Sequence, residues 1–447
     1  MLAAPPCSST RSRSSPSPRE SATRSRAAAN SRSSASSARK VLRGRPPRVS
    51  SRARTATPRR WVRGDESEPK MTRVAVNLLW CLPGRVGGSE QYLVRQIAGL
   101  RDALGHEFDM HDFDVHAYVP RGFSRAHPHL ADTATVHESR SSQSSRVLRV
   151  AVEATWFASR ARGAALVHHG GGTLPPRSPQ PSLLTVHDLQ YLVYPEYFSA
   201  AKLRYLTSRM PVSVRRATRI AVPSEYVRRT VVERLGVPED KVCVVRHGVE
   251  SSLGAQHTGE RELRERFGLG AQHVLAYPAV THPHKNHDFL CDLVAGPLRD
   301  RDVQVVFAGG HGRAHDDIAR RIVSDGLGDR VKMVGRLGER DRDGLLAMSA
   351  ALVFPSRYEG FGAPVIEAMA MGTPVIAADR TALPEVVGAA GHVVALDVGA
   401  WASAFDDAIA RREHWSALGA ARAAQFTAAA SGRDLADAYR RTIGAAS

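Results

Sequence analysis

Cysteine is scarce in this chain, and long apolar runs are missing. Four of the 447 residues are cysteines, at positions 7, 81, 243 and 291, without the close pairing of a zinc site or a disulfide framework. No run approaches the roughly 18 apolar residues of a membrane span, and no secretory h-region is present. We therefore expect a cytoplasmic chain in a reducing compartment, without structural disulfides.

Acidic residues are nearly absent from the first 70 positions. This stretch holds 17 Lys and Arg against four Asp and Glu, whereas the rest of the chain holds 45 against 40. Most of the net charge of +18 therefore lies in an N-terminal extension that is rich in Ser, Arg, Ala and Pro. Because such a composition buries too little apolar area to fold, we predict that residues 1–70 are disordered.

Three interpretations of this extension compete. It has the Ser/Arg-rich, acid-poor composition of a transit segment, and it has the charge of a basic arm for nucleic acid or anionic lipid. The third interpretation is that the natural chain starts at Met71, which directly precedes a clean strand pattern over Thr72 to Leu79. We favour the third and expect no specific binding of nucleic acid, because the remaining chain is nearly balanced in charge.

After Met71, short β-branched runs alternate with longer amphipathic segments. This order is typical of parallel α/β sheets. We predict an α/β fold with two Rossmann-like, doubly wound domains over residues 71–250 and 251–425, followed by a helix within residues 426–447. Ligands of such sheets bind beyond the carboxyl ends of the strands, so a cleft is expected there.

Two carboxylates, Glu359 and Glu367, stand eight positions apart in the segment Glu-Gly-Phe-Gly-Ala-Pro-Val-Ile-Glu. A buried strand pattern precedes it, which places Gly360-Phe361-Gly362 at the entrance of a helix. Free N–H groups at such an entrance favour the phosphate end of a nucleotide. Glu359 is placed to accept hydrogen bonds from sugar hydroxyls, and Glu367 from a ribose. The alternative is one carboxylate that stabilises the helix dipole and one solvated helix Glu.

The same nine residues resemble the signature of the retaining family 4 glycosyltransferases, which have the GT-B fold. Both Glu positions and the intervening Gly-Phe-Gly match. The resemblance implies that Glu359 contacts the donor sugar and Glu367 the ribose of a nucleotide-diphosphate sugar. It further implies that residues 71–250 bind the acceptor, that residues 251–425 bind the donor nucleotide, and that the terminal helix in residues 426–447 returns to the first domain.

Two glycines and a histidine are candidates in the first half of the chain. Gly87 and Gly88 lie between the first strand and its helix, where they allow the backbone to approach a ligand, although a simple tight turn has the same pattern. His187 ends a strand pattern in Thr185-Val-His-Asp-Leu189, and a lone histidine is more often structural. Both segments resemble family 4 loops, which implies that the glycines face the donor phosphate and that His187 lies near the reacting sugar carbon.

Lys285 lies in the loop Thr281-His-Pro-His-Lys-Asn-His287. Its ammonium group can neutralise a diphosphate leaving group as charge develops, whereas a solvated loop lysine is the plainer interpretation. The Pro-x-Lys-Asn core is similar to the family's phosphate loop, but the arginine often found near that lysine is missing. This leaves a second cationic contact open: either His282 or His284 could supply it when protonated, with a pH dependence near neutrality. The spacing of His282, His284 and His287 does not match a standard zinc site, and we predict no metal and no cofactor.

The resemblance implies a retaining, metal-independent hexosyltransferase that moves a sugar from a nucleotide-diphosphate donor to a glycan or lipid-linked acceptor, with catalytic roles for Glu359, His187 and Lys285. GDP-mannose is the favoured donor, because the Val-His-Asp and His-Lys-Asn segments look most like mannosyltransferase members, but UDP-glucose and dTDP-rhamnose fit as well. The alternatives are a GT-B nucleotide-sugar epimerase and a nucleic-acid binder that acts through the basic extension.

A lipid-linked acceptor implies peripheral contact with the inner face of a membrane. A basic cluster can rest on anionic lipid, although a solvated helix face is the plainer interpretation. The candidate cluster consists of Arg209, Arg215, Arg216 and Arg219.

Overall fold

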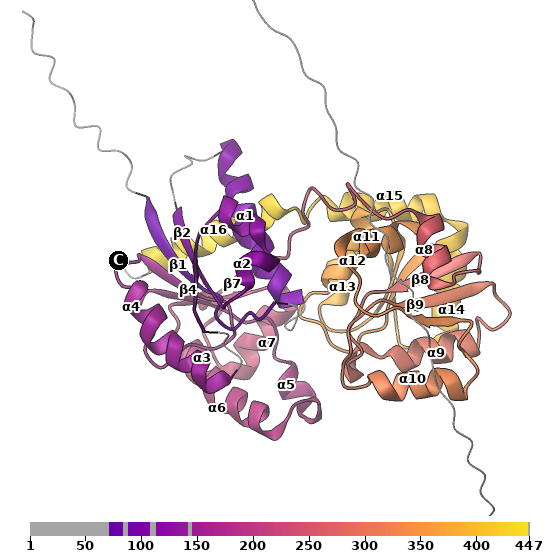
Figure 1. Cartoon of the computed structure of the whole chain (residues 1–447), viewed down its shortest axis with the longest axis horizontal. Helices are drawn as coiled ribbons and strands as arrows, with labels where there is room; N and C mark the ends of the chain where they lie inside the picture. Colours follow the sequence, from indigo (N-terminus) through magenta and orange to yellow (C-terminus); the bar gives the residue numbers. More distant parts are fainter. Residues whose placement is uncertain (1–70, 84–87, 108–112, 142–144, 446–447) are drawn as a thin grey trace, which may run out of the picture. The chain divides into compact units, whose positions relative to one another are not determined.

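The computed structural model describes residues 71–83, 88–107, 113–141 and 145–445 (Figure 1). The predicted disordered extension, residues 1–70, lies outside the described residues. Gly87 of the Gly-Gly pair also lies outside them.

The strand patterns of the first half of the chain form a seven-stranded sheet in the order β3-β2-β1-β4-β5-β6-β7. All of its neighbouring strands are parallel. Since helices cover both faces of a parallel sheet, its central strands are shielded from solvent on both sides, and β4 and β5 are buried along their whole length. The strands are β1 (Thr72–Asn77), β2 (Phe113–Val119), β3 (Thr135–Glu138), β4 (Leu166–His169), β5 (Ser182–Thr185), β6 (Arg219–Val222) and β7 (Val242–Val244).

The second half forms a six-stranded sheet in the order β10-β9-β8-β11-β12-β13, again with parallel neighbours. Strand β1 begins the first sheet near its middle and β8 does the same in the second, so the chain winds outward in both directions, as in doubly wound folds. The predicted pair of Rossmann-like sheets is thereby confirmed. The strands are β8 (His273–Tyr277), β9 (Val303–Phe307), β10 (Val331–Met333), β11 (Ala351–Phe354), β12 (Val375–Ala378) and β13 (His392–Val394).

Helices connect the strands, and several begin at side chains that cap them. Ser199, Ser224 and Thr427 each accept a hydrogen bond from the N–H three residues further on, which fixes the starts of three helices. In the described segments, every helix is too short or too polar to cross a bilayer. The helices of the first half are α1 (Gly88–Glu107), α2 (Phe123–Ala126), α3 (Arg146–Val152), α4 (Ala158–Arg160), α5 (Gln190–Val193), α6 (Ala200–Arg216) and α7 (Glu225–Leu235).

The second half adds further helices around its sheet and a last helix beyond it. They are α8 (Glu260–Phe267), α9 (His287–Ala295), α10 (His315–Ser324), α11 (Glu339–Met348), α12 (Ala363–Ala370), α13 (Leu383–Val387), α14 (Val398–Ala410), α15 (Arg412–Ala423) and α16 (Ala428–Gly444). Single turns of other helix types are η1 (Pro128–Asp132), η2 (Glu153–Phe157), η3 (Pro195–Tyr197), η4 (Glu239–Lys241) and η5 (Pro283–Lys285).

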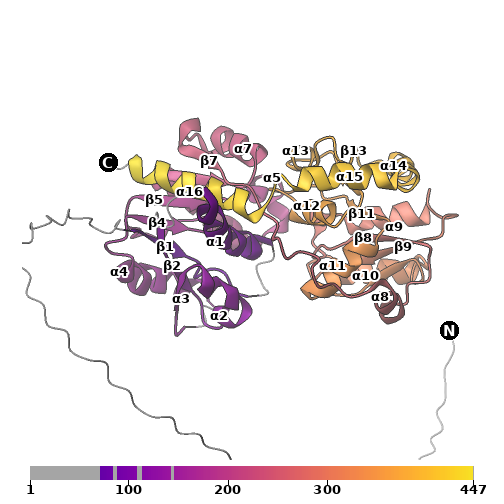
Figure 2. The same ribbon diagram turned by 90° about the horizontal axis from the view of Figure 1, so that it is seen from above.

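Helix α16 packs directly against α1, and the two lie side by side in Figures 1 and 2. Glycine makes this possible, because a Cβ on Gly99 would lie 2.0 Å from the Ala428 carbonyl oxygen, and one on Gly432 would lie 2.0 Å from the Gly99 oxygen. The Tyr439 hydroxyl of α16 lies 3.0 Å from Nδ1 of His168 on β4. The last helix therefore belongs to the core of the first sheet.

Candidate functional site

A cavity of about 970 Å³ opens at the carboxyl ends of strands from both sheets. Its lining segments directly follow β5, β6, β8, β9, β10 and β11, which is the edge where ligands of parallel sheets bind. Every predicted site residue that the structure describes lines it, namely Gly88, His187, Lys285, Glu359, Gly360, Phe361, Gly362 and Glu367. The cavity therefore brings together four residues that are at least 74 positions apart in the sequence, namely Gly88, His187, Lys285 and Glu359.

Lys285 and Glu359 meet in this wall, with Lys285 Nζ 2.5 Å from Glu359 Oε1. Lys285 ends the η5 turn after β8, and the Tyr277 hydroxyl donates a hydrogen bond to its carbonyl oxygen. Glu359 lies in the loop between β11 and α12, where its N–H donates to Thr381 Oγ1 at 2.9 Å. Both side chains are largely shielded from solvent, so a cation and an anion stand in contact on the cavity surface.

The glycines of the predicted segment have two separate structural roles. Gly362 caps α12 with a φ of 95°, a left-handed conformation that favours glycine, and Pro364 follows in the first turn. A Cβ on Gly360 would lie 2.3 Å from the His187 carbonyl oxygen, so only glycine lets this loop touch the end of β5. Ser224 Oγ donates to the Gly360 carbonyl oxygen at 2.7 Å and holds the loop in place. The predicted helix entrance is confirmed.

Phe361 lines the cavity, and its ring also packs on a neighbouring aromatic ring. Its ring stacks on His247 with centroids 4.5 Å apart, and His247 stacks on Tyr92 of α1 at 4.0 Å. This stack links α1, the segment after β7 and the α12 entrance. His247 lines the cavity as well, and the sequence analysis did not identify it.

His187 is held in one orientation at the end of β5. Its Nε2 lies 2.8 Å from the Gly170 carbonyl oxygen, which requires the proton on Nε2 and leaves Nδ1 as an acceptor. Burial lowers the pKa of His187, and the Gly170 hydrogen bond and the Asp188 charge oppose this only in part. The ring is therefore neutral near pH 7. Asp188 accepts a hydrogen bond from the Gln190 N–H at 2.9 Å and orients the loop.

Glu367 is paired with an arginine that the sequence analysis missed. Nη1 of Arg95, on α1, lies 2.6 Å from Glu367 Oε1, and the two side chains are 3% and 7% exposed. Burial by itself would raise the pKa of Glu367, but the charges of Arg95 and Arg342 outweigh it and hold the pKa below its usual value. The carboxylate at the expected ribose position is therefore ionised.

Neither His282 nor His284 fills the open place of a second cation. Burial, followed by the charge of Lys285, lowers the pKa of His284 to about 2, and the same two causes lower the pKa of His282. Both rings are neutral near pH 7. The further cations that line the cavity are arginines, at positions 95, 336 and 342.

No group of three or more His, Cys, Asp or Glu side chains is arranged to hold a metal ion in the described part of the chain. Gly88 lines the cavity at the start of α1, and a Cβ there would meet no atom within 4 Å. Packing within the protein therefore does not require this glycine, and its approach to a donor phosphate stays a prediction.

Arginines of the basic cluster on α6 and β6 contact neighbouring segments, and Arg215 and Arg216 are exposed. Side chains of Arg209, Arg216 and Arg219 donate to the carbonyl oxygens of Leu174, Pro175 and Arg441, respectively. Three of the four arginines thus brace neighbouring segments, and contact of this cluster with lipid stays a prediction.

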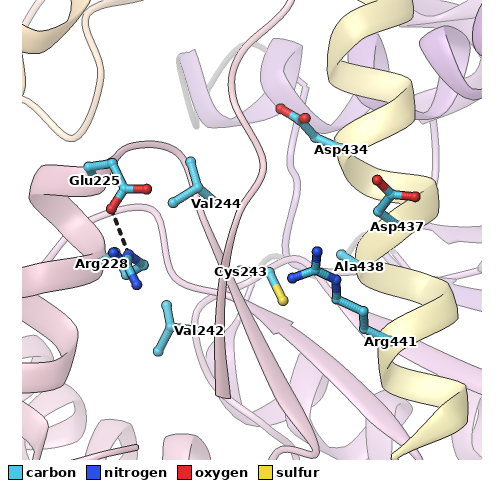
Figure 3. Close-up of a pocket in the computed structure, with 9 residues that line it drawn as sticks. All are labelled: Glu225, Arg228, Val242, Cys243, Val244, Asp434, Asp437, Ala438 and Arg441. Atoms are coloured by element: carbon cyan, nitrogen blue, oxygen red, sulfur yellow. Dashed lines mark hydrogen bonds and ion pairs between the residues drawn. The ribbon is translucent and has the colours of Figure 1, made fainter. Parts of the chain in front are cut away.

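A second hollow, of about 310 Å³, lies between α7, β7 and α16 (Figure 3). It shares no lining residue with the large cavity. Arg228 in its wall pairs with Glu225 and Glu239, and Asp434 pairs with Arg246. These groups satisfy each other, so the large cavity is the candidate site.

Comparisons with known proteins match both halves of the chain. A model described as "Glycosyltransferase Family 4" matches residues 86–253, and one described as "Glycosyl transferases group 1" matches residues 272–411. Among similar proteins, O-antigen chain mannosyltransferase B of Escherichia coli is 28% identical over 58% of this chain and 70% of its own length. The D-inositol 3-phosphate glycosyltransferase of Kineococcus radiotolerans is 31% identical over 52% of this chain, and O-antigen chain mannosyltransferase RfbU of Salmonella typhimurium is 27% identical over 52%. The matches span 58% and 64% of these two relatives, respectively.

Solved structures share the arrangement of both sheets. Anabaena HepE in complex with UDP and glucose aligns over 83% of this chain and all of its own, with a TM-score of 0.63 and 20% identity. Sucrose-phosphate synthase of Thermosynechococcus elongatus aligns over 84% of this chain and all of its own, with a TM-score of 0.66 and 20% identity. At this identity the likeness establishes the fold, and it confirms the predicted GT-B architecture.

Proposed function

This chain belongs to glycosyltransferase family 4, and we propose that it transfers a hexose from a nucleotide-diphosphate sugar to a glycan or lipid-linked acceptor with retention of configuration. The contact between Lys285 and Glu359 carries the proposal. A cation for phosphate and a carboxylate for hydroxyls, 2.5 Å apart, suit a ligand in which sugar and diphosphate are directly bonded. Glu367 then receives the ribose.

In the proposed mechanism the positive groups act on the leaving diphosphate. As the bond from the anomeric carbon to the phosphate oxygen breaks, Lys285 and the N–H groups at the α12 entrance stabilise the developing negative charge. The acceptor hydroxyl oxygen bonds to that carbon on the same face, and its proton passes to the departing phosphate oxygen. Glu359 holds hydroxyls of the sugar, and neutral His187 accepts a further one at Nδ1. We propose that these groups suffice without a divalent cation.

We propose GDP-mannose as the donor, and two of the similar proteins are named mannosyltransferases. The test is thermal unfolding with GDP, UDP, dTDP or ADP, because a ligand that binds only the native state stabilises it by about 2.7 kcal/mol at 100 times its Kd. We expect GDP to raise the Tm most. A larger shift with UDP or dTDP would replace the guanine assignment while leaving the enzyme class intact.

Substitution of Glu367 is expected to weaken nucleotide binding, whereas substitution of Glu359 is expected to lower kcat. Glu367→Ala removes a hydrogen bond from ribose to a carboxylate, worth about 1.5–3 kcal/mol, so the Kd for the nucleoside diphosphate rises by roughly 10- to 100-fold. Glu359→Gln keeps that affinity, and kcat falls by about 10²-fold, because a charged acceptor at the sugar is lost. Calorimetry and steady-state kinetics measure the two effects.

Glu262→Gln provides the matched control, since Glu262 is exposed on α8 and outside the cavity. Unchanged Kd and kcat in both cavity variants would contradict the assignment. Conversion of the donor sugar to its epimer in the absence of acceptor would support the epimerase alternative. Contact with a membrane stays a proposal that depends on a lipid-linked acceptor.

A further inference from the structure

Arg95 has no role in the mechanism above, yet it contacts Glu367, the proposed ribose-binding carboxylate. Its Nη1 lies 2.6 Å from Glu367 Oε1, and its Nε lies 3.0 Å from Glu250 Oε1. The three residues come from α1, from the segment after β7 and from α12, and Arg95 and Glu367 both line the cavity. One buried guanidinium thus connects three separate parts of the chain at the site.

The packing around Arg95 restricts where its guanidinium can lie. One turn further along α1, Gly99 is in close contact with the start of α16. Next to Glu250, Val249 donates its N–H to the Phe426 carbonyl oxygen at 2.7 Å and accepts from the Ala428 N–H at 2.9 Å. Both the helix that carries Arg95 and the carboxylate that anchors its Nε are therefore fixed by the segment that leads into α16.

This anchoring determines which part of Glu367 is left for a ligand. Oε1 is occupied by Arg95, and none of the described residues donates a hydrogen bond to Oε2. Because the planar guanidinium is held at Nε, its Nη1 fixes the rotation of the Glu367 carboxyl group. The charge of Arg95 also keeps that carboxyl ionised, so it accepts hydrogen bonds from hydroxyl groups and donates none.

We propose that Arg95 is a positioning residue, which orients the Glu367 carboxylate for the ribose hydroxyls of the donor. The inference rests on the proposed function, since it requires that Glu367 binds ribose. It adds that nucleotide recognition depends on α1 of the first sheet as well as on the second sheet. Arg95 contributes to the preference for a ribose with both hydroxyls, and it has no direct part in the bond-breaking step.

The test compares two ligands in each variant: GDP and its 2′,3′-dideoxy analogue, or the uridine pair if UDP gives the larger thermal shift. In the wild-type protein we expect GDP to bind at least tenfold more tightly than the analogue. In Arg95→Met we expect the GDP affinity to fall by about tenfold, the analogue affinity to stay unchanged, and the preference to disappear. Arg95→Lys restores the charge without the planar fork and recovers the preference in part.

Two further variants separate positioning from folding. Glu250→Ala removes only the acceptor that anchors Nε and is expected to reduce the preference less than Arg95→Met does. Arg246→Met breaks another ion pair, the one with Asp434 on α16 at 3.0 Å, outside the cavity, and should leave the preference unchanged. In kinetic assays Arg95→Met is expected to raise the donor KM while kcat changes less than threefold.

The results that overturn the proposal are distinct from those that overturn the proposed function. If the wild-type protein does not distinguish GDP from its dideoxy analogue, the ribose assignment of Glu367 fails and this inference fails with it. If the wild-type preference is present and Arg95→Met retains it, or loses affinity for both ligands equally, Arg95 is only a structural brace and the proposed function stands. If Arg95→Met does not fold, Arg95→Lys and Glu250→Ala replace it, and an unchanged preference in these two variants also overturns the proposal.

Discussion

Lys285→Ala lowers kcat by about 10²- to 10³-fold, which is the usual cost of removing one group that stabilises charge developing in a transition state. The reason lies in its place, because Lys285 is the cavity cation that contacts Glu359, the proposed holder of the donor sugar. The loss appears in kcat more than in the affinity for nucleotide, because negative charge on the leaving oxygen is greatest in the transition state. Release of nucleoside diphosphate, followed with saturating donor and acceptor, measures it.

The controls for this variant test both charge and position. Lys285→Arg keeps the charge in a larger group and should recover part of the rate. Lys332→Ala removes a lysine that extends from β10 to the Gly328 carbonyl oxygen and does not line the cavity, so kcat should be unchanged. A decrease in kcat of less than threefold in Lys285→Ala, with an unchanged Tm, would contradict the proposed role.

Gly360→Ala is expected to lower kcat by about 10²-fold without touching any chemically active group. The new Cβ would lie 2.3 Å from the His187 carbonyl oxygen and 3.3 Å from the Asp188 Cβ, so the loop and the end of β5 must move apart. That movement separates Glu359 from His187, and a displacement of about 1 Å between groups that hold a substrate costs rates of this size. The accompanying loss of stability should be about 1–3 kcal/mol, as for other overpacked sites.

Gly270→Ala is the matched control, because a Cβ at that loop position meets nothing within 4 Å and lies outside the cavity. Steady-state kinetics and chemical denaturation of the two variants give the comparison. If Gly360→Ala has the kcat of the wild type, contact between the loop and β5 is not needed for catalysis. If it loses stability alone, Gly360 serves folding and not the site.

The parts of the site that could be predicted were those that local stereochemistry determines. The α12 entrance was found because Gly362 and Pro364 suit only a few backbone conformations, and these occur at the start of a helix. Lys285 and His187 were found because each follows a strand pattern, and the carboxyl ends of parallel strands gather on one edge of a sheet. Their functional roles came from the family resemblance and stay proposals.

What could not be predicted depends on contacts between distant residues. Arg95 lies 272 positions from Glu367, and nothing in the sequence around it shows that it is buried. The neutral state of His284 follows from burial, which a polar loop pattern does not reveal. Strand β3, Thr135–Glu138, cannot be recognised from its sequence, because this edge strand has exposed ends and lacks a run of apolar residues.

The close packing of α16 on α1 has a consequence for when the protein can fold during its synthesis. Helix α16 follows the second sheet in the sequence, yet it supplies Tyr439 to the core of the first. While the ribosome is synthesising the second sheet, the first sheet has already emerged with the surface around Gly99 unfilled. Although domains generally fold as they emerge, the half of this protein that appears first cannot complete its core until the chain beyond residue 427 has been synthesised.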